Sequence, residues 1–201
     1  MLRVVCCTVW GMRHRQTEDS LEAFLGTGGQ HLFDGEEVRG PHVPVTLEYE
    51  LIDPNDPLMY AQVIRRLWNE CAESRDDLCL IEQDIEIGPT TLYDFRACQH
   101  LYCGNPYPWT TNVGIAMGCT RFRHQIIERY RDAVDEAIAL GGGHFRQFDV
   151  IFQRRVLAKR HGAQPHVHAP VIHHNEAKRL RADASPVPLE GVPADDIGEL
   201  L

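Results

Sequence analysis

Leu78-Cys79-Leu80-Ile81-Glu82-Gln83-Asp84 is the stretch of this sequence that carries most information about the fold. Four apolar residues are followed by two carboxylates with one residue between them. A short apolar run is typical of a strand buried on both faces of an α/β sheet, and residues two apart on a strand point to the same side. We therefore expect a strand over residues 78–81 that leaves the core at Glu82 and Asp84, an arrangement that suits a divalent cation with oxygen ligands.

The residues around this strand alternate between strand-like and helix-like patterns. Residues 2–9 are a β-branched run that indicates a buried first strand, and residues 58–73 place apolar side chains four apart on one helical face. The other expected elements are strands within 43–52, 101–109, 113–119 and 165–172, and helices at 20–25, 90–98, 121–140 and 148–161. The predicted fold class is α/β, a single domain with a mixed, mostly parallel central sheet flanked by helices.

The composition is that of a soluble globular protein. The chain has 201 residues, of which 43% are hydrophobic and 24% charged, and this excludes disordered, collagen-like and mucin-like chains. No apolar run approaches the roughly 20 residues that span a bilayer, so we expect a cytoplasmic protein with no membrane partner. The seven cysteines form no CxxC pair, which predicts reduced, buried thiols rather than a disulfide framework or a zinc ribbon.

Charge is distributed unevenly along the chain. The net charge is −9, and residues 183–201 contribute five acidic and no basic side chains. We predict an acidic, proline-containing C-terminal tail over residues 176–201 that is loosely attached to the domain. Residues 121–160 carry nine basic and five acidic side chains, a stretch that could meet a phosphate or form a solvated helix face.

Four stretches together resemble a known family. Residues 80–85, 101–107, 114–122 and 162–174 are similar to segments of the small GT-A-fold glycosyltransferases common in bacteriophage genomes, with Glu82-Gln83-Asp84 in place of the DxD motif. The resemblance covers about residues 2–175 and implies a GT-A-like catalytic domain over residues 1–175. Glu82 departs from the first Asp of the motif, and its longer side chain would shift it toward a ribose or away from direct ligation.

The resemblance implies a nucleotide-sugar donor, a UDP-sugar above others. The end of the first strand is where doubly wound sheets bind nucleotides, which makes Thr8 and Trp10 candidate donor-site residues. Trp10 would stack on the base, or it would simply cap the core. Glu82 and Gln83 are the other expected donor contacts.

A Mn²⁺ or Mg²⁺ ion is implied between Asp84 and the donor diphosphate. A late histidine often completes this metal site in the family, and His173 and His174 both match in position. Neighbouring residues on a strand point in opposite directions, so the sequence leaves open which of the two faces the metal. An alternative is a zinc site formed by these two histidines with His166 and His168. The sequence contains no HExxH motif that would support such a site.

The remaining candidates are a base and an acceptor surface. Asp149, expected at the start of a late helix, is the predicted general base for an inverting transfer; the alternative is an acidic residue that stabilises the helix dipole. Trp109, Thr111 and Asn112 are predicted to contact the acceptor or the donor sugar, although core packing is the common fate of a Trp in such a segment.

The predicted function is a metal-dependent transfer of sugar to a hydroxyl group of a macromolecule. In a phage-type setting the acceptor would be a hydroxymethylated pyrimidine in viral DNA or a Ser or Thr side chain of a virion protein. Two alternatives remain open at this stage. One is an inactive nucleotide-sugar-binding module, suggested by the Glu82 departure. The other is a nucleotidyltransferase, for which the glycines at 26–29 are a poor phosphate loop.

Overall fold

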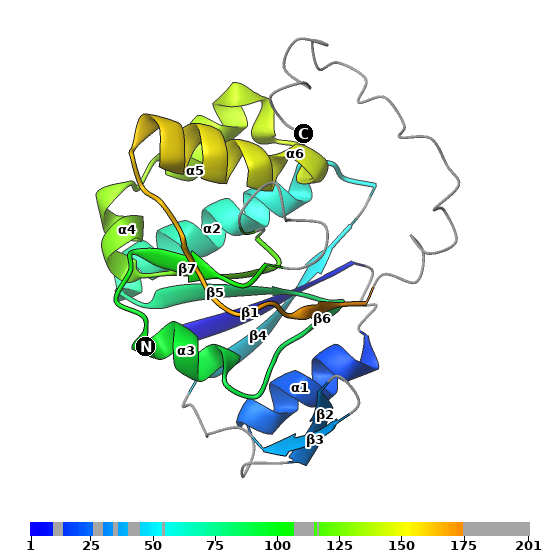
Figure 1. Ribbon diagram of the computed structural model, residues 1–201. Helices are drawn as coiled ribbons and strands as arrows, with labels where there is room; N and C mark the ends of the chain where they lie inside the picture. The colour runs from blue at the N-terminus through cyan, green and yellow to red at the C-terminus, as the bar shows by residue number, and fades with distance from the viewer. Residues whose placement is uncertain are drawn as a thin grey trace.

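A six-stranded sheet runs through the middle of the molecule in the computed structural model (Figure 1). The structure describes residues 1–9, 14–25, 30–33, 36–39, 45–53, 55–106, 115 and 117–174. In spatial order the strands are β4 (Thr46–Ile52), β1 (Leu2–Val9), β5 (Asp77–Glu82), β8 (Cys119–Phe122), β7 (Tyr102–Gly104) and β9 (His166–Val167). Of these six, β8 alone runs against the others, which confirms the predicted mixed, mostly parallel sheet.

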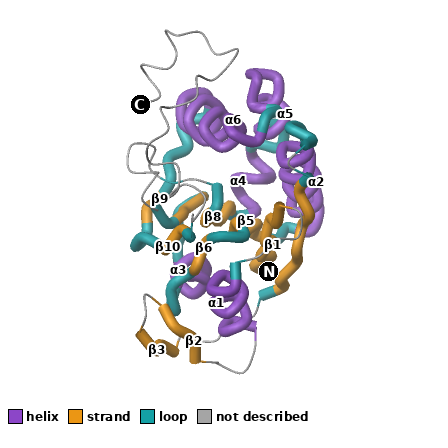
Figure 2. The backbone as a smooth tube through the Cα atoms, turned by 90° about the vertical axis from the view of Figure 1, so that its right-hand side faces the viewer, coloured by secondary structure: helices purple, strands orange, loops and turns teal. Residues whose placement is uncertain are grey.

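Helices cover both faces of this sheet (Figure 2). One face carries α2 (Met59–Ser74), α4 (His124–Arg129), α5 (Ala133–Ala137) and α6 (Phe145–Val150), and the other carries α1 (Arg15–Leu25) and α3 (Thr91–Ala97). The alternation of β1 divides its side chains between the two layers: Val5 and Cys7 join the first core, and Val4 and Cys6 the second. Burial on both faces explains why the central strands are almost wholly apolar.

The strongly periodic elements were predicted correctly. The helices predicted at 58–73 and 90–98 are α2 and α3, and the strand predicted at 78–81 lies within β5, which ends at Glu82. The helix predicted at 20–25 is the second half of α1. All seven cysteines are buried and free of disulfide bonds, as expected.

The prediction of one helix over residues 121–140 was wrong. Arg121 and Phe122 belong to β8, and the helical part that follows is divided into α4, a turn, α5 and the π-helical segment η2 (Ile138–Gly142). All four residues of β8 are buried, so the strand shows no polar alternation that the sequence could reveal. The predicted glycine stop is present: Gly141 has a φ of 91°, which glycine adopts without strain.

The last predicted helix begins earlier than expected. It consists of α6 followed by a π-helical segment, η3 (Ile151–Arg160), whose wider turn is visible where His161 N–H donates to Val156 O at 3.0 Å. Asp149 therefore lies near the end of α6, and the placement of Asp149 at a helix start was wrong.

Two strand predictions also need correction. Within the range of the strand expected at 113–119, residues 117–118 form a turn and Cys119 begins β8, while residues 113, 114 and 116 lie outside the described part of the chain. The strand expected at 165–172 is interrupted: after β9 the chain breaks away and forms β10 (Ile172–His173), which pairs antiparallel with β6 (Ile85–Glu86). A hairpin of β2 (Gln30–Phe33) and β3 (Glu36–Arg39) was not predicted.

The predicted tail over residues 176–201 lies outside the described residues. Among the helices that the structure describes, none combines the length and the apolar character that a membrane crossing requires.

Candidate active site

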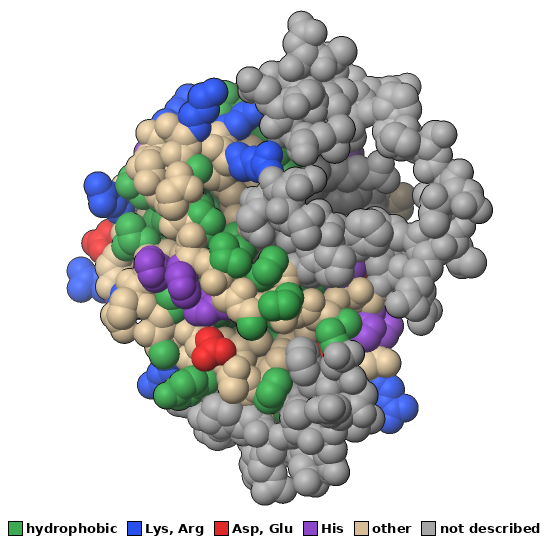
Figure 3. Space-filling view, viewed as in Figure 1, with side chains coloured by type: hydrophobic (Ala, Val, Ile, Leu, Met, Phe, Trp, Pro, Cys, Tyr) green, Lys and Arg blue, Asp and Glu red, His purple; other side chains and the backbone are tan. Residues whose placement is uncertain are grey.

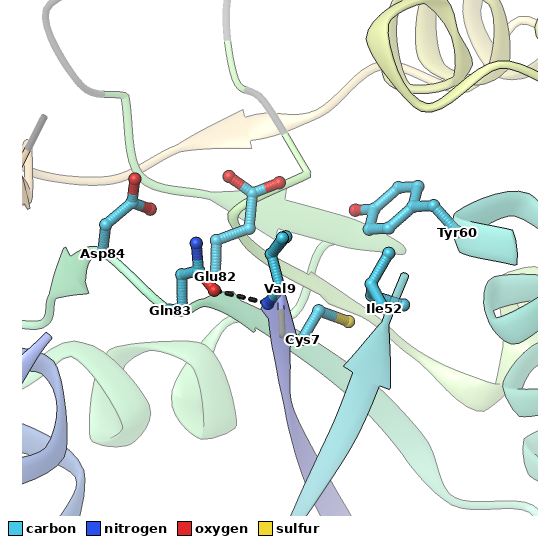
Figure 4. Close-up of a pocket in the computed structure, with 7 residues that line it drawn as sticks. All are labelled: Cys7, Val9, Ile52, Tyr60, Glu82, Gln83 and Asp84. Atoms are coloured by element: carbon cyan, nitrogen blue, oxygen red, sulfur yellow. Dashed lines mark hydrogen bonds between the residues drawn. The ribbon is translucent and has the colours of Figure 1, made fainter. Parts of the chain in front are cut away.

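Three parallel strands end side by side at a pocket (Figure 4). β1 ends at Val9, β4 at Ile52 and β5 at Glu82, and the sheet register pairs Val9 with Ile52. The described residues that line the pocket are Cys7, Val9, Ile52, Tyr60, Glu82, Gln83 and Asp84. Ligands of open α/β sheets bind in the crevice beyond the carboxyl ends of the strands, and this pocket has that position.

Two carboxylates and an imidazole converge beside the pocket. Potential ligand atoms of Glu82, Asp84 and His173 all lie within 4.8 Å of one another, and His173 Nε2 is 3.5 Å from Asp84 Oδ2. Both carboxylates point to the same side of the turn after β5 (Figure 4). The longer side chain of Glu82 therefore does not remove it from the group. The role of these residues as cation ligands stays a prediction.

Gln83 holds the turn in place between these carboxylates. Its Oε1 accepts a hydrogen bond from Val9 N–H, and its backbone carbonyl accepts one from His14 N–H at 3.0 Å. The carboxamide oxygen is thus occupied by the end of β1. Gln83 lines the pocket, and its side chain links the end of β1 to the turn that follows β5.

His173 and His174 have different surroundings. The pairing of β10 with β6 brings His173 opposite Ile85 and toward Asp84. His174 Nε2 instead lies 2.6 Å from Glu86 Oε2, and its ring stacks on that of His14 with centroids 4.3 Å apart. The geometry therefore favours His173, not His174, as the histidine that belongs with the carboxylates.

At the end of β1 the pocket contains Cys7 and Val9 rather than the predicted Thr8. The strand alternation turns Thr8 away, and its hydroxyl donates to Glu50 O at 3.2 Å. Burial raises the pKa of the Cys7 thiol well above its usual value, with Glu82 adding to the effect. The Cys7 thiol therefore stays neutral at pH 7 and forms part of the pocket wall.

Asp149 is half-buried on α6. This helix lies on the same face of the sheet as α2, which carries Tyr60. Its neighbour Phe148 packs edge-on against Tyr60, whose ring lines the pocket, with centroids 5.9 Å apart. Burial raises the pKa of the Asp149 carboxyl, and a hydrogen bond from Val150 N–H at 2.8 Å opposes that shift. A raised pKa suits a carboxylate that accepts a proton near neutral pH.

Four candidates lie outside the described residues: Trp10, Trp109, Thr111 and Asn112. Their predicted roles at the donor and acceptor therefore stay predictions.

The basic side chains of residues 121–160 have different surroundings, and a phosphate contact of this stretch stays a prediction. Arg121 is buried under α3, where its guanidinium donates to the carbonyls of Phe95 and Cys98. Two exposed members have acidic partners. Arg131 lies 3.4 Å from Glu73, and Arg160 lies 2.7 Å from Glu136.

The four late histidines do not form one site. His173 and His174 lie against β6, whereas His166 and His168 lie beside Cys98 at the edge strand β9. Sequence reasoning missed Cys98, Tyr60 and the buried Glu86. The one available signal was the spacing of Cys98 and His100, two residues apart, before a buried strand.

Comparisons with known proteins locate this arrangement among solved folds. No protein-family model and no curated protein matches the chain. A solved structure does: a glycosyltransferase involved in the glycosylation of the major capsid of PBCV-1, with a TM-score of 0.51 and 16% sequence identity, covering 85% of this chain and 83% of that one. The chain shares its fold with a glycosyltransferase.

Proposed function

We propose that this chain is a metal-dependent glycosyltransferase that moves a sugar from a nucleotide-sugar donor to a hydroxyl group. The observation that carries the proposal is the convergence of Glu82, Asp84 and His173 beside a pocket at the carboxyl ends of β1, β4 and β5. A glycosyltransferase of similar fold supports the same class of reaction.

The ligand set fits a divalent cation and favours Mn²⁺ over Mg²⁺. Asp84 and Glu82 offer hard carboxylate oxygens, while His173 offers an imidazole nitrogen. Mg²⁺ takes oxygen ligands almost exclusively, whereas Mn²⁺ lies higher in the affinity order for sites that contain nitrogen. A cation held here would neutralise the charge that develops on the leaving diphosphate.

The chain's own residues account for the other requirements of the transfer. Asp84 and His173 would hold the cation at the diphosphate end of the donor, and Gln83 joins the turn between the carboxylates to the end of β1. The acceptor oxygen attacks the anomeric carbon as the bond from that carbon to the diphosphate oxygen breaks. Asp149 is the proposed base that takes the acceptor's proton, for which its raised pKa is suited.

A protein hydroxyl is the favoured acceptor class. Binding to duplex DNA draws most of its affinity from cations that neutralise phosphates. Arg121 is buried, and Arg131 and Arg160 are paired with acidic side chains, which weakens the case for DNA. The similar solved structure is described as acting in the glycosylation of a capsid protein. We therefore propose a Ser or Thr side chain of a virion protein as the acceptor.

Thermal unfolding with a panel of UDP-, GDP-, ADP- and dTDP-sugars, each with and without Mn²⁺, tests the donor site. A ligand that binds the folded chain raises its Tm. We expect one UDP-sugar to raise Tm only when Mn²⁺ is present, and D84N to abolish that response. A panel without any response contradicts the proposal.

Product analysis then distinguishes the reaction classes. Release of a nucleoside diphosphate together with a glycosylated acceptor supports the proposal. Transfer of the nucleotide itself indicates a nucleotidyltransferase, and donor binding without turnover indicates an inactive binding module. Salt-dependent binding of duplex DNA would instead favour the DNA acceptor.

A further inference from the structure

A second group of metal-ligand side chains lies at the opposite edge of the sheet from the β1–β4 pair. Potential ligand atoms of Cys98, His166 and His168 lie within 4.8 Å of one another. Cys98 directly follows α3, and the two histidines flank Val167 on β9, the outermost strand beyond β7. Histidine side chains gather in a group on the face seen in Figure 3.

The distance between Cys98 and His166 matches the spacing of two ligands in a tetrahedral zinc site. Cys98 Sγ lies 3.5 Å from His166 Nδ1. Zinc bound to sulfur at about 2.3 Å and to nitrogen at about 2.0–2.1 Å in tetrahedral geometry holds those two atoms roughly 3.6 Å apart. Alternation along the chain sends His166 and His168 to the same side, and their ring centroids lie 4.6 Å apart.

One nitrogen atom in this group has an unsatisfied hydrogen-bonding capacity in the described part of the chain. Within the described part of the chain, His168 Nε2 is buried and has no hydrogen-bond partner. Buried polar atoms in native structures are nearly always hydrogen-bonded, and an exception needs an explanation such as an ion.

Hydrogen bonds fix the backbone of these three residues from two sides. Arg121 donates to the carbonyl of Cys98 from both terminal nitrogens, each at 3.0 Å. On the other side, β9 pairs with β7 in register Cys103 to His166, and His168 N–H donates to Gly104 O at 2.9 Å. The group is thus preorganised by α3 and the sheet, which lowers the cost of binding an ion.

We propose that Cys98, His166 and His168 form a Zn²⁺ site that anchors the edge strand β9 to the end of α3. One thiolate and two imidazoles are a ligand set that selects zinc over the hard cations expected at Glu82 and Asp84. The fourth position is left to water, with the exposed ring of His100 stacked on His166 at 4.4 Å and shielding one side.

The proposed site lies at the start of the segment that leads from β9 to His173. Between β9 and β10 the chain is held along residues 105–106, where Ala169 O accepts from Asn105 Nδ2 and Val171 N–H donates to Pro106 O at 3.1 Å. A bound ion would fix the start of this path at β9. The zinc site is therefore separate from the candidate active site and supports the segment that leads into it.

Zinc content is the direct test. The full chain carrying D84N, which weakens the carboxylate site, is stripped with a chelator, loaded with Zn²⁺, desalted and analysed by mass spectrometry. We expect one tightly held zinc per chain, and its loss when C98S or H168Q is added. H124Q is the matched control, because His124 lies 3.2 Å from Asp77 and outside the group, and this variant should keep its zinc.

Cobalt substitution identifies the ligand. A thiolate-to-cobalt charge-transfer band should appear with Co²⁺ and vanish in C98S, while its retention in C98S would overturn the proposal. If C98S does not fold, zinc protection of Cys98 from alkylation in the unmodified chain replaces it. Failure of the chain to retain zinc after loading, or equal alkylation with and without zinc, also overturns the proposal.

Discussion

His173 Nε2 lies 3.5 Å from Asp84 Oδ2, although the two residues are far apart in the sequence. The contact depends on the antiparallel pair of β6 and β10, in which His173 stands opposite Ile85. The backbone repeats the link one residue further on, because His174 N–H donates to Asp84 O at 2.8 Å. Two strands of two residues each therefore decide whether the candidate cation site is complete.

Asp84 is the first residue to test. D84N keeps the shape of the side chain and removes its charge, so the folded structure should persist while Mn²⁺ affinity falls at least about tenfold, which corresponds to roughly 1.4 kcal/mol. The measurement is the Mn²⁺-dependent change in Tm across a metal titration. D19N is the control, since Asp19 lies exposed on α1 beside Arg15. Equal Mn²⁺ affinity in D84N and the unmodified chain would refute the assignment.

The two neighbouring histidines should respond differently. H173Q is expected to weaken Mn²⁺ binding with little change in Tm without metal. H174A should leave Mn²⁺ binding nearly intact but lower stability, because it leaves the buried carboxylate of Glu86 without its partner, at a cost of about 1–3 kcal/mol. Chemical denaturation and metal titration of both variants give the comparison. If H174A rather than H173Q loses the metal, the assignment of the two rings is reversed.

Asp149 should reveal itself through pH. Its pKa is raised in the folded chain, so at intermediate pH the folded protein holds a proton that the unfolded chain has released. The free energy of unfolding therefore falls as pH rises from the unfolded pKa, about 3.9, through the folded pKa, and stays lower above it. D149N removes this penalty. We expect D149N to melt above the unmodified chain at pH 7, and at the same temperature below about pH 4.

Turnover completes the test of Asp149. D149N should bind the donor normally and lose most of its transfer activity, because the amide cannot accept the acceptor's proton. A stabilised variant with full activity would show that Asp149 is a buried structural carboxylate and that another group is the base.

Elements with a local apolar pattern could be predicted from the sequence. Contacts that depend on pairing between distant strands could not. The strand before Glu82 and the helix α2 were predicted from apolar patterns alone, because each pattern is local. The choice between His173 and His174 depends on the register of β10 against β6, which no local pattern carries. Likewise Cys98 meets His166 only because β9 returns beside β7.

Arg121 shows that the location of a charged residue is also not determined by local sequence. Arg121 was interpreted as the start of a helix in the basic stretch over residues 121–160, but tertiary structure places it in a buried strand. Its guanidinium donates to Phe95 O at 2.6 Å and to Cys98 O, and its Nε lies 3.7 Å from Asp77 Oδ2. Five donors in a planar fork make this multiple contact specific to arginine.

R121M is therefore expected to be strongly destabilising. It leaves the carbonyls of Phe95 and Cys98 without the donors of the buried guanidinium, and each buried acceptor that loses its partner costs about 1–3 kcal/mol. R131M is the matched control, because Arg131 is exposed and its pair with Glu73 is worth at most about 1 kcal/mol. Urea unfolding of the two variants measures the difference. Equal stability would mean that the end of α3 is held without Arg121, and that Cys98, the proposed zinc ligand, depends on other contacts for its position.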